Sequence, residues 1–165
     1  GDNGYYWWIY SSDGTPLLDL SRYGEAGQAD WSPDSEKIAL EVGSNRLGLF
    51  ILYLAEDGPT VEVERARYIA PPEKKYLSGP RWSPDGTRLA YTAWQIGAQS
   101  GEYTELRLLE DGSYRRYSAG AGSASTFVAD PWTWTSPSVL TVTGDATSHG
   151  AGPAGREITR ITIDF

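Results

Sequence analysis

The chain has 165 residues, about the length of one domain, and 22 acidic against 14 basic residues give it a formal net charge of −8. This acidic balance disfavours nucleic acid and anionic membranes as partners, and no run of about 18 apolar residues predicts a membrane span. Cysteine is absent, which excludes disulfides and thiolate metal ligands. Seven Trp and eleven Tyr beside nineteen Gly and ten Pro favour short strands separated by turns.

The first elements predicted along the chain are two strands joined by a tight turn. Residues 5–10 are all aromatic or aliphatic, and Asp13-Gly14, a strong hairpin signal, follows them. Residues 15–20 then form the return strand. Because both faces of the run 5–10 are apolar, we expect sheets to pack on both sides of it.

A ten-residue motif begins at Trp31 and recurs. Residues 31–40 read Trp-Ser-Pro-Asp-Ser-Glu-Lys-Ile-Ala-Leu, and residues 82–91 read Trp-Ser-Pro-Asp-Gly-Thr-Arg-Leu-Ala-Tyr, 51 positions later. Pro, Asp and Gly suit successive positions of a turn, so each copy predicts a hairpin turn followed by a strand. Ser35 stands where the second copy has Gly86, and a left-handed backbone at a serine costs very roughly 1 kcal/mol.

A second apolar run follows each copy and leads into Asp-Gly. This pattern predicts the end of a third strand, a hairpin turn and a fourth strand in each period. No window has a sustained 3.6-residue period, so little or no helix is expected. The predicted strands of the two complete periods are 37–42, 47–55 and 60–67, and then 88–93, 103–109 and 113–117. A shortened third copy of the motif begins at Trp134 and includes Pro137.

Four short strands per period predict an all-β fold of four-stranded antiparallel sheets. Such sheets, stacked face to face around an axis, are the blades of a β-propeller. We therefore expect a single partial β-propeller of about three blades. Its parts are 1–20 as two strands of a split blade, 28–67 and 79–117 as blades, and 129–165 as a blade that lacks its outer strand.

The stretch 82–91, continued by a strand into Asp111-Gly112, resembles the WD40-like Pro-Asp repeat of TolB-type β-propellers. The resemblance extends over essentially the whole chain, although the period of about 51 residues exceeds the 40–45 of an ordinary blade. It implies a propeller of six to eight blades, usually bacterial and often periplasmic or extracellular. The family's recurring residues are structural, and here they are Trp31, Pro33, Asp34, Trp82, Pro84, Asp85, Gly86, Trp134 and Pro137.

Three blades are fewer than a closed propeller needs, since closed rings have at least four. Methionine is also absent, even at position 1. We expect either a slice of a longer chain, whose remainder completes the ring, or a homodimer that closes a six-bladed ring.

The order of the strands predicts where a binding surface lies. The tight turns share one edge of the sheets, and the long irregular segments share the opposite edge, where function is expected. These segments are 21–29, 70–80, 94–102, 118–126 and 145–156. The candidate ligand-binding residues in or beside them are Trp94, Tyr103, Tyr76, His149, Lys74 and Lys75, with Tyr68 nearby. The aromatic rings are suited to stacking on sugars or anchoring a peptide, and the lysines to receiving an acidic partner.

The sequence contains no catalytic motif, and we expect no metal and no cofactor. Gly-x-Ser-x-Gly is absent, and the Gly-x-Gly-x-x-Gly match at 150–155 precedes an alternating strand rather than a helix. The expected function is a non-enzymatic propeller scaffold that binds a protein or peptide in the bacterial envelope, in the periplasm or outside the cell. The alternatives are the accessory propeller of a prolyl-oligopeptidase-like serine peptidase and a carbohydrate-binding or carbohydrate-active propeller.

Overall fold

The computed structural model of the chain describes residues 6–43, 47–57, 60–72, 75–95, 104–110, 113–118, 133–145 and 156–162. Within these ranges it has thirteen strands and one short 3-10 turn, η1 (Ser21–Tyr23), and no α-helix. Every strand pair in these ranges is antiparallel. The predicted all-β class is therefore confirmed.

The strands form four sheets in the described part of the chain, and two of them have four strands each. We number the sheets in chain order. Sheet 1 contains β1 (Trp8–Tyr10) and β2 (Pro16–Asp19); sheet 2 contains β3 (Ala26–Trp31), β4 (Lys37–Val42), β5 (Leu49–Asp57) and β6 (Thr60–Ile69). Sheet 3 contains β7 (Lys75–Trp82), β8 (Arg88–Gln95), β9 (Thr104–Glu110) and β10 (Ser113–Ser118), and sheet 4 contains β11 (Thr133–Ser136), β12 (Val139–Asp145) and β13 (Arg156–Thr162).

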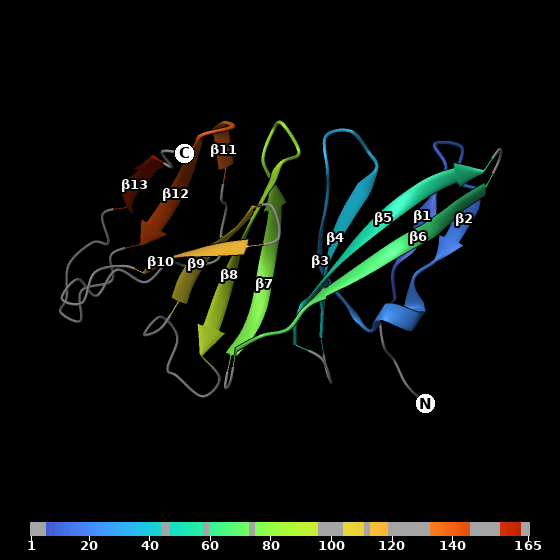
Figure 1. Cartoon of the computed structure of the whole chain (residues 1–165), viewed down its shortest axis with the longest axis horizontal. Helices are drawn as coiled ribbons and strands as arrows, with labels where there is room; N and C mark the ends of the chain where they lie inside the picture. Colours follow the sequence, from blue (N-terminus) through green and yellow to red (C-terminus); the bar gives the residue numbers. More distant parts are fainter. Residues whose placement is uncertain are drawn as a thin grey trace.

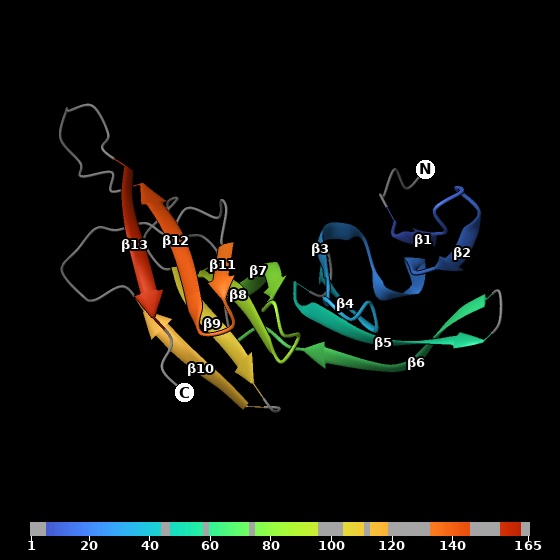
Figure 2. The ribbon, with the colours of Figure 1, turned by 90° about the horizontal axis from the view of Figure 1, so that it is seen from above.

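Successive strands of each sheet pair in chain order, as antiparallel meanders do. The hairpin signals explain this order, because each tight turn returns the chain beside the strand that it has just left. The two complete sheets are compatible with propeller blades, which are four-stranded antiparallel sheets. The sheets stand beside one another in a row (Figures 1 and 2).

Sheet 2 is buried on both faces because its side chains alternate between two cores. On β4, Ile38 and Leu40 pack toward sheet 1, whereas Ala39 packs toward sheet 3. On β5, Leu52 packs toward sheet 1 and Ile51 packs toward sheet 3. Strands β4 and β5, which are apolar on both faces, therefore lie between two sheets.

The first strand departs from this rule. Ile9 is buried against sheet 2, but Tyr6, Trp8 and Tyr10 are exposed on the other side of β1. The prediction that sheets cover both faces of residues 5–10 is therefore wrong in this structure. An apolar pattern shows that a strand is suited to two-sided burial, but the covering sheet has to come from elsewhere.

Strand β7 begins earlier than the sequence predicts. Segment 70–80 was expected to be irregular, yet its residues from Lys75 onward belong to the strand. The register of β7 with β8 shifts between Ser78 and Arg81, where Gly79 has a φ of 62°. Gly79 and Pro80 are thus accommodated in a β-bulge, which is where sheets tolerate both residue types.

The register places the tight turns and the long connections at opposite edges of the sheets. Lys37, at the start of β4, pairs with Tyr53 near the end where β5 turns into β6. At the far end of the same strands, Leu49 pairs with Ile69. We call the edge with turns 32–36 and 83–87 the turn edge, and the edge where β4, β6 and β8 end the loop edge (Figure 1).

No helix in the described part of the chain is long and apolar enough to cross a membrane.

Candidate functional site

Three turns along the turn edge share one hydrogen-bond pattern. In each, a serine hydroxyl donates to Oδ1 of the aspartate two positions later, and the backbone N–H two positions after that aspartate donates to the same oxygen. The turns are 11–15, 32–36 and 83–87. The sequence suggests two kinds of turn, Asp-Gly and Pro-Asp, but the backbone folds both into one arrangement.

The residue after each aspartate has a left-handed backbone. The φ angles are 86° at Gly14, 62° at Ser35 and 69° at Gly86. The left-handed conformation predicted at Ser35 is therefore confirmed. Serine carries a Cβ that this region disfavours, so the turn of sheet 2 is strained where the other two are relaxed.

The hydrogen bonds of these turns favour the ionised aspartates. The Ser11 hydroxyl, which donates to Asp13, is the main cause that lowers the pKa of that carboxyl to about 2. The same kind of hydrogen bond, helped by Lys37, lowers the pKa of Asp34 below its ordinary value. Partial burial acts to raise the pKa of Asp85, but its hydrogen bonds to Ser83 and Thr87 outweigh burial and leave that pKa lowered.

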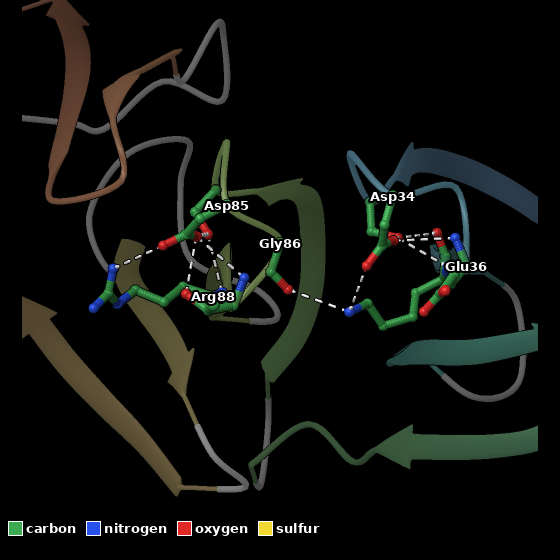
Figure 3. A network of polar contacts seen from close by, with 9 residues as sticks. Asp34, Glu36, Asp85, Gly86 and Arg88 are labelled. Atoms are coloured by element: carbon green, nitrogen blue, oxygen red, sulfur yellow. Dashed lines mark hydrogen bonds and ion pairs between the residues drawn. The ribbon is translucent and has the colours of Figure 1, made fainter.

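A basic side chain links each complete sheet to the turn of the next sheet. Lys37 Nζ donates to the Gly86 carbonyl at 3.3 Å (Figure 3). Arg88 Nη1 donates to the Pro137 carbonyl at 2.9 Å. Both contacts span 49 residues. Lys37 also pairs with Asp34 at 3.3 Å. The charged groups of the turn edge thus hold the sheets together.

The three repeat tryptophans differ in their surroundings. Lys37 Nζ lies 5.3 Å from the centre of the Trp82 ring, and Nε1 of Trp134 donates to the Arg81 carbonyl at 3.2 Å. Both side chains are partly buried. Trp31 is 44% exposed. The second and third tryptophans therefore contact the preceding sheet.

Two carboxylates of sheet 2 bind the bulged strand of sheet 3. Oδ2 of Asp30 accepts the backbone N–H of Trp82 at 2.6 Å. Oε2 of Glu41 accepts the Ser78 hydroxyl at 2.9 Å and the Gly79 N–H at 3.2 Å. Burial raises the pKa of Asp30 against the opposing effect of its hydrogen bond. These carboxylates accept backbone N–H groups of β7, which is the edge strand of sheet 3.

At the loop edge, a residue with a strained backbone joins sheets 2 and 3 by a hydrogen bond. Leu47 has a φ of 49°, which is uncommon for a bulky side chain, and its carbonyl accepts the Leu77 N–H at 2.9 Å. Gly48 beside it is packed so closely that a Cβ would stand 2.6 Å from the Ile69 carbonyl oxygen. The Tyr68 ring, 40% exposed, lies over Phe50 with 4.9 Å between ring centres.

The structure brings some of the predicted ligand-binding residues together. Tyr76 and Trp94 are direct cross-strand partners in β7 and β8, and Lys75 pairs with Gln95 beside them at the loop edge. These residues were expected in loops, but they extend the strands instead. Lys74, Tyr103 and His149 lie outside the described residues.

Sequence reasoning missed the strained contact at Leu47 and the carboxylates that bind the bulge. Glu41 had a visible signal, since it is a charged residue inside the otherwise apolar strand 38–42. Leu47 had none, because a left-handed leucine has no sequence signature. Among the described residues, no group of three or more His, Asp or Glu side chains is arranged to hold a metal ion.

The sequence matches no known protein-family model, and no curated protein matches it either. Function has therefore to be inferred from the geometry of the chain itself.

Proposed function

We propose that the chain is part of a TolB-type β-propeller that acts as a non-enzymatic scaffold for a protein or peptide partner. The observation that carries this proposal is the repeated contact between sheets. Lys37 and Arg88 hold the same place in successive repeats, and each donates to a turn carbonyl 49 residues further along. A contact repeated at constant spacing generates a constant step from sheet to sheet, as around a propeller axis.

The stacking of the sheets supports the same architecture. Strand β3, the first of sheet 2, lies against β7, the first of sheet 3. In a propeller the first strands of the blades line the axis, so neighbouring first strands are expected to contact one another. The two-sided burial of sheet 2 also fits a blade between two others.

We propose the loop edge as the binding surface because aromatic residues lie at the ends of its strands. On the turn edge, the aspartates and basic residues already form turns and bridges between sheets. The loop edge instead carries the cross-strand pair Tyr76–Trp94 and the exposed ring of Tyr68. Aromatic rings at the ends of rigid strands suit an extended peptide. The resemblance to exported bacterial propellers makes the periplasm or the cell exterior the proposed location.

Selection from a displayed peptide library tests this function. Peptides selected on the immobilised chain are measured by fluorescence polarisation against the wild type, Tyr76→Ala and Tyr68→Ala. Each substitution is expected to weaken binding about tenfold. Glu36→Ala, exposed on the turn edge, is the matched control and should bind as the wild type does. Circular dichroism verifies that each variant is folded.

Three outcomes would overturn the proposal. Equal affinity of all variants would remove the loop edge as the site. A glycan-array signal that is lost in Trp94→Ala, without any selected peptide, would favour a carbohydrate-binding propeller. A downstream α/β-hydrolase segment in the full reading frame would favour the accessory propeller of a serine peptidase.

A further inference from the structure

Strand β6 is the outermost strand of sheet 2 and forms a long edge. It runs over ten residues, Thr60–Ile69, and in the described part of the chain it pairs with β5 alone. It lies at the outer side of sheet 2 (Figure 2), and each of its residues is at least partly exposed. The backbone groups along such an edge form a template on which another strand pairs.

The charges of β6 are divided between its two halves. Glu62 and Glu64 come first, and Arg65 and Arg67 follow, so the strand has no net charge although the whole chain carries −8. Two copies of the strand in antiparallel pairing would place Glu62 opposite Arg67 and Glu64 opposite Arg65. Opposite charges that face each other across neighbouring strands stabilise the pairing, whereas like charges destabilise it. The order of charges on β6 is therefore complementary to itself.

A β-bulge divides β6 into two parts that alternate out of step. The register with β5 skips Glu64, which is the extra residue of the bulge. Val63 on one side of it packs toward sheet 1, whereas Ile69 on the other side packs toward sheet 3. Residues six positions apart lie on the same face of a regular strand. The bulge has therefore shifted the alternation of one part by one residue.

This shift brings the opposite charges to one face of the sheet. Glu62 precedes Val63 and so lies on the face turned toward sheet 3. Arg67 lies on that face too, because it pairs with Ile51, which packs in the core between sheets 2 and 3. In an uninterrupted strand Glu62 and Arg67, five positions apart, would lie on opposite faces. Since directly opposed residues of paired strands share a face, the bulge makes the charge match possible.

Arg65 is held in a position that suits this pairing. Its guanidinium lies over the Tyr53 ring, 3.8 Å from the ring centre. A guanidinium that stacks on an aromatic face keeps its N–H groups in its own plane, where carboxylates accept them. Because the ring already restrains the arginine, less side-chain entropy is lost when a carboxylate binds it.

The corresponding outer strand of sheet 3 lacks this pattern. Strand β10 contains Arg115 and Arg116 and no acidic residue. A second copy of β10 in antiparallel pairing would bring like charges together, which opposes pairing. Self-complementary charge is therefore a property of β6 and not of the repeat.

We propose that β6 pairs antiparallel with β6 of a second copy of the chain about a two-fold axis. The four-stranded sheets of the two copies then form one continuous sheet. Glu62 lies opposite Arg67 of the second copy on one face, and Val63 lies opposite Ala66 of the second copy on the other. The same contacts occur twice, as in every two-fold interface. The pairing uses the edge of β6, so its test does not depend on peptide binding at the loop edge.

Sedimentation velocity over a range of concentrations measures the dimerisation of the wild type, Glu62→Arg and Arg67→Glu. Each substitution makes both copies of one charge pair repulsive and is expected to weaken the dimer at least about tenfold. An equal mixture of the two variants is expected to dimerise as the wild type does, because each introduced charge then faces an opposite charge. Glu36→Arg, the same charge change at an exposed residue of the turn edge, is the matched control and should not alter dimerisation.

Amide hydrogen exchange locates the interface, and amides of β6 are expected to be protected in the dimer relative to the dilute monomer. A chain that stays monomeric at every concentration would overturn the proposal. A dimer that both variants leave unchanged would do the same, since its interface lies elsewhere. So would a mixture that does not restore the dimer when circular dichroism shows both variants folded. Glu64→Arg and Arg65→Glu form a second pair, tested in the same way if either of the first variants does not fold.

Discussion

Ser35 holds the left-handed turn position that Gly14 and Gly86 hold in the other two turns. Replacing it with glycine removes the strain on Cβ without loss of a side-chain contact that the turn requires. Ser35→Gly is expected to raise the free energy of unfolding by about 1 kcal/mol. Chemical denaturation monitored by tryptophan fluorescence measures this change. Gly86→Ser is the reciprocal variant and should lower stability by a similar amount, since a Cβ there meets only ordinary contacts, the nearest at 3.5 Å.

The turn aspartates predict the pH dependence of stability. The pKa of Asp34 and that of Asp85 are lowered by folding, so the ionised forms stabilise the folded state at pH values above the ordinary pKa of 3.8. That contribution is lost as the pH falls from 3.8 through the folded-state pKa. Stability is therefore expected to fall below about pH 4. Denaturation curves at pH 2 to 6 measure the effect.

Asp34→Asn is the control for this titration, because asparagine keeps the turn acceptor but does not ionise. This variant should lose less stability than the wild type as the pH falls below about 4. Asp30 has the opposite effect on stability. Burial raises its pKa, so the ionised carboxylate destabilises the folded state at neutral pH, and this penalty is relieved as the pH falls through the raised pKa toward 3.8. Asp30→Asn should therefore steepen the net acid loss. An unchanged profile in both variants would refute these assignments.

At the scale of elements, tryptophans at equivalent positions of the repeat contribute unequally to stability. Trp82 packs against the core between sheets 2 and 3 beneath Lys37, whereas Trp31 is 44% exposed. Trp82→Ala is expected to cost about 3–5 kcal/mol, the range for a packed aromatic residue. Trp31→Ala should cost less than half as much in the isolated chain. Urea denaturation of both variants makes the comparison, and equal costs would contradict it.

The bulge of β7 shows why the first part of this strand was not predicted from the sequence. Turn residues have local causes, so Asp-Gly and Pro-Asp located the hairpins, and β4 has the predicted bounds of 37–42. Gly79 and Pro80 have the same local signature as loop residues, but they lie within a strand, where Glu41 of sheet 2 accepts the Gly79 N–H. That partner is 38 residues away, and no local rule contains it.

At the scale of the whole molecule, each sheet contacts its neighbours, so stability should be distributed interface by interface. Ile51 and Leu52 are adjacent on β5 but belong to the two different cores. Ile51→Ala is expected to increase hydrogen exchange in sheet 3, and Leu52→Ala in sheet 1, each at a cost of about 2–5 kcal/mol. Native-state hydrogen exchange with mass spectrometry distinguishes the two. Uniform loss of protection in both variants would indicate a single cooperative unit.

The candidate site was predictable only in part. The sequence placed Tyr76 and Trp94 near one edge, but it did not indicate that they are cross-strand partners, because pairing depends on the register set by the bulge. The contact of Leu47 with Leu77 was invisible, since it joins two sheets through a backbone conformation that leucine rarely adopts.

The sequence by itself determined the strands, the turns and the repeat, because alternation and turn chemistry act over a few neighbouring residues. Only the tertiary structure decided which apolar faces are covered. Tyr6, Trp8 and Tyr10 have a composition suited to burial, yet they remain exposed, whereas Leu40 and Ile51 are fully enclosed. Burial depends on the arrival of a second sheet, and the contacts that bring sheets together join residues far apart in the sequence, 49 positions in the case of Lys37 and Gly86.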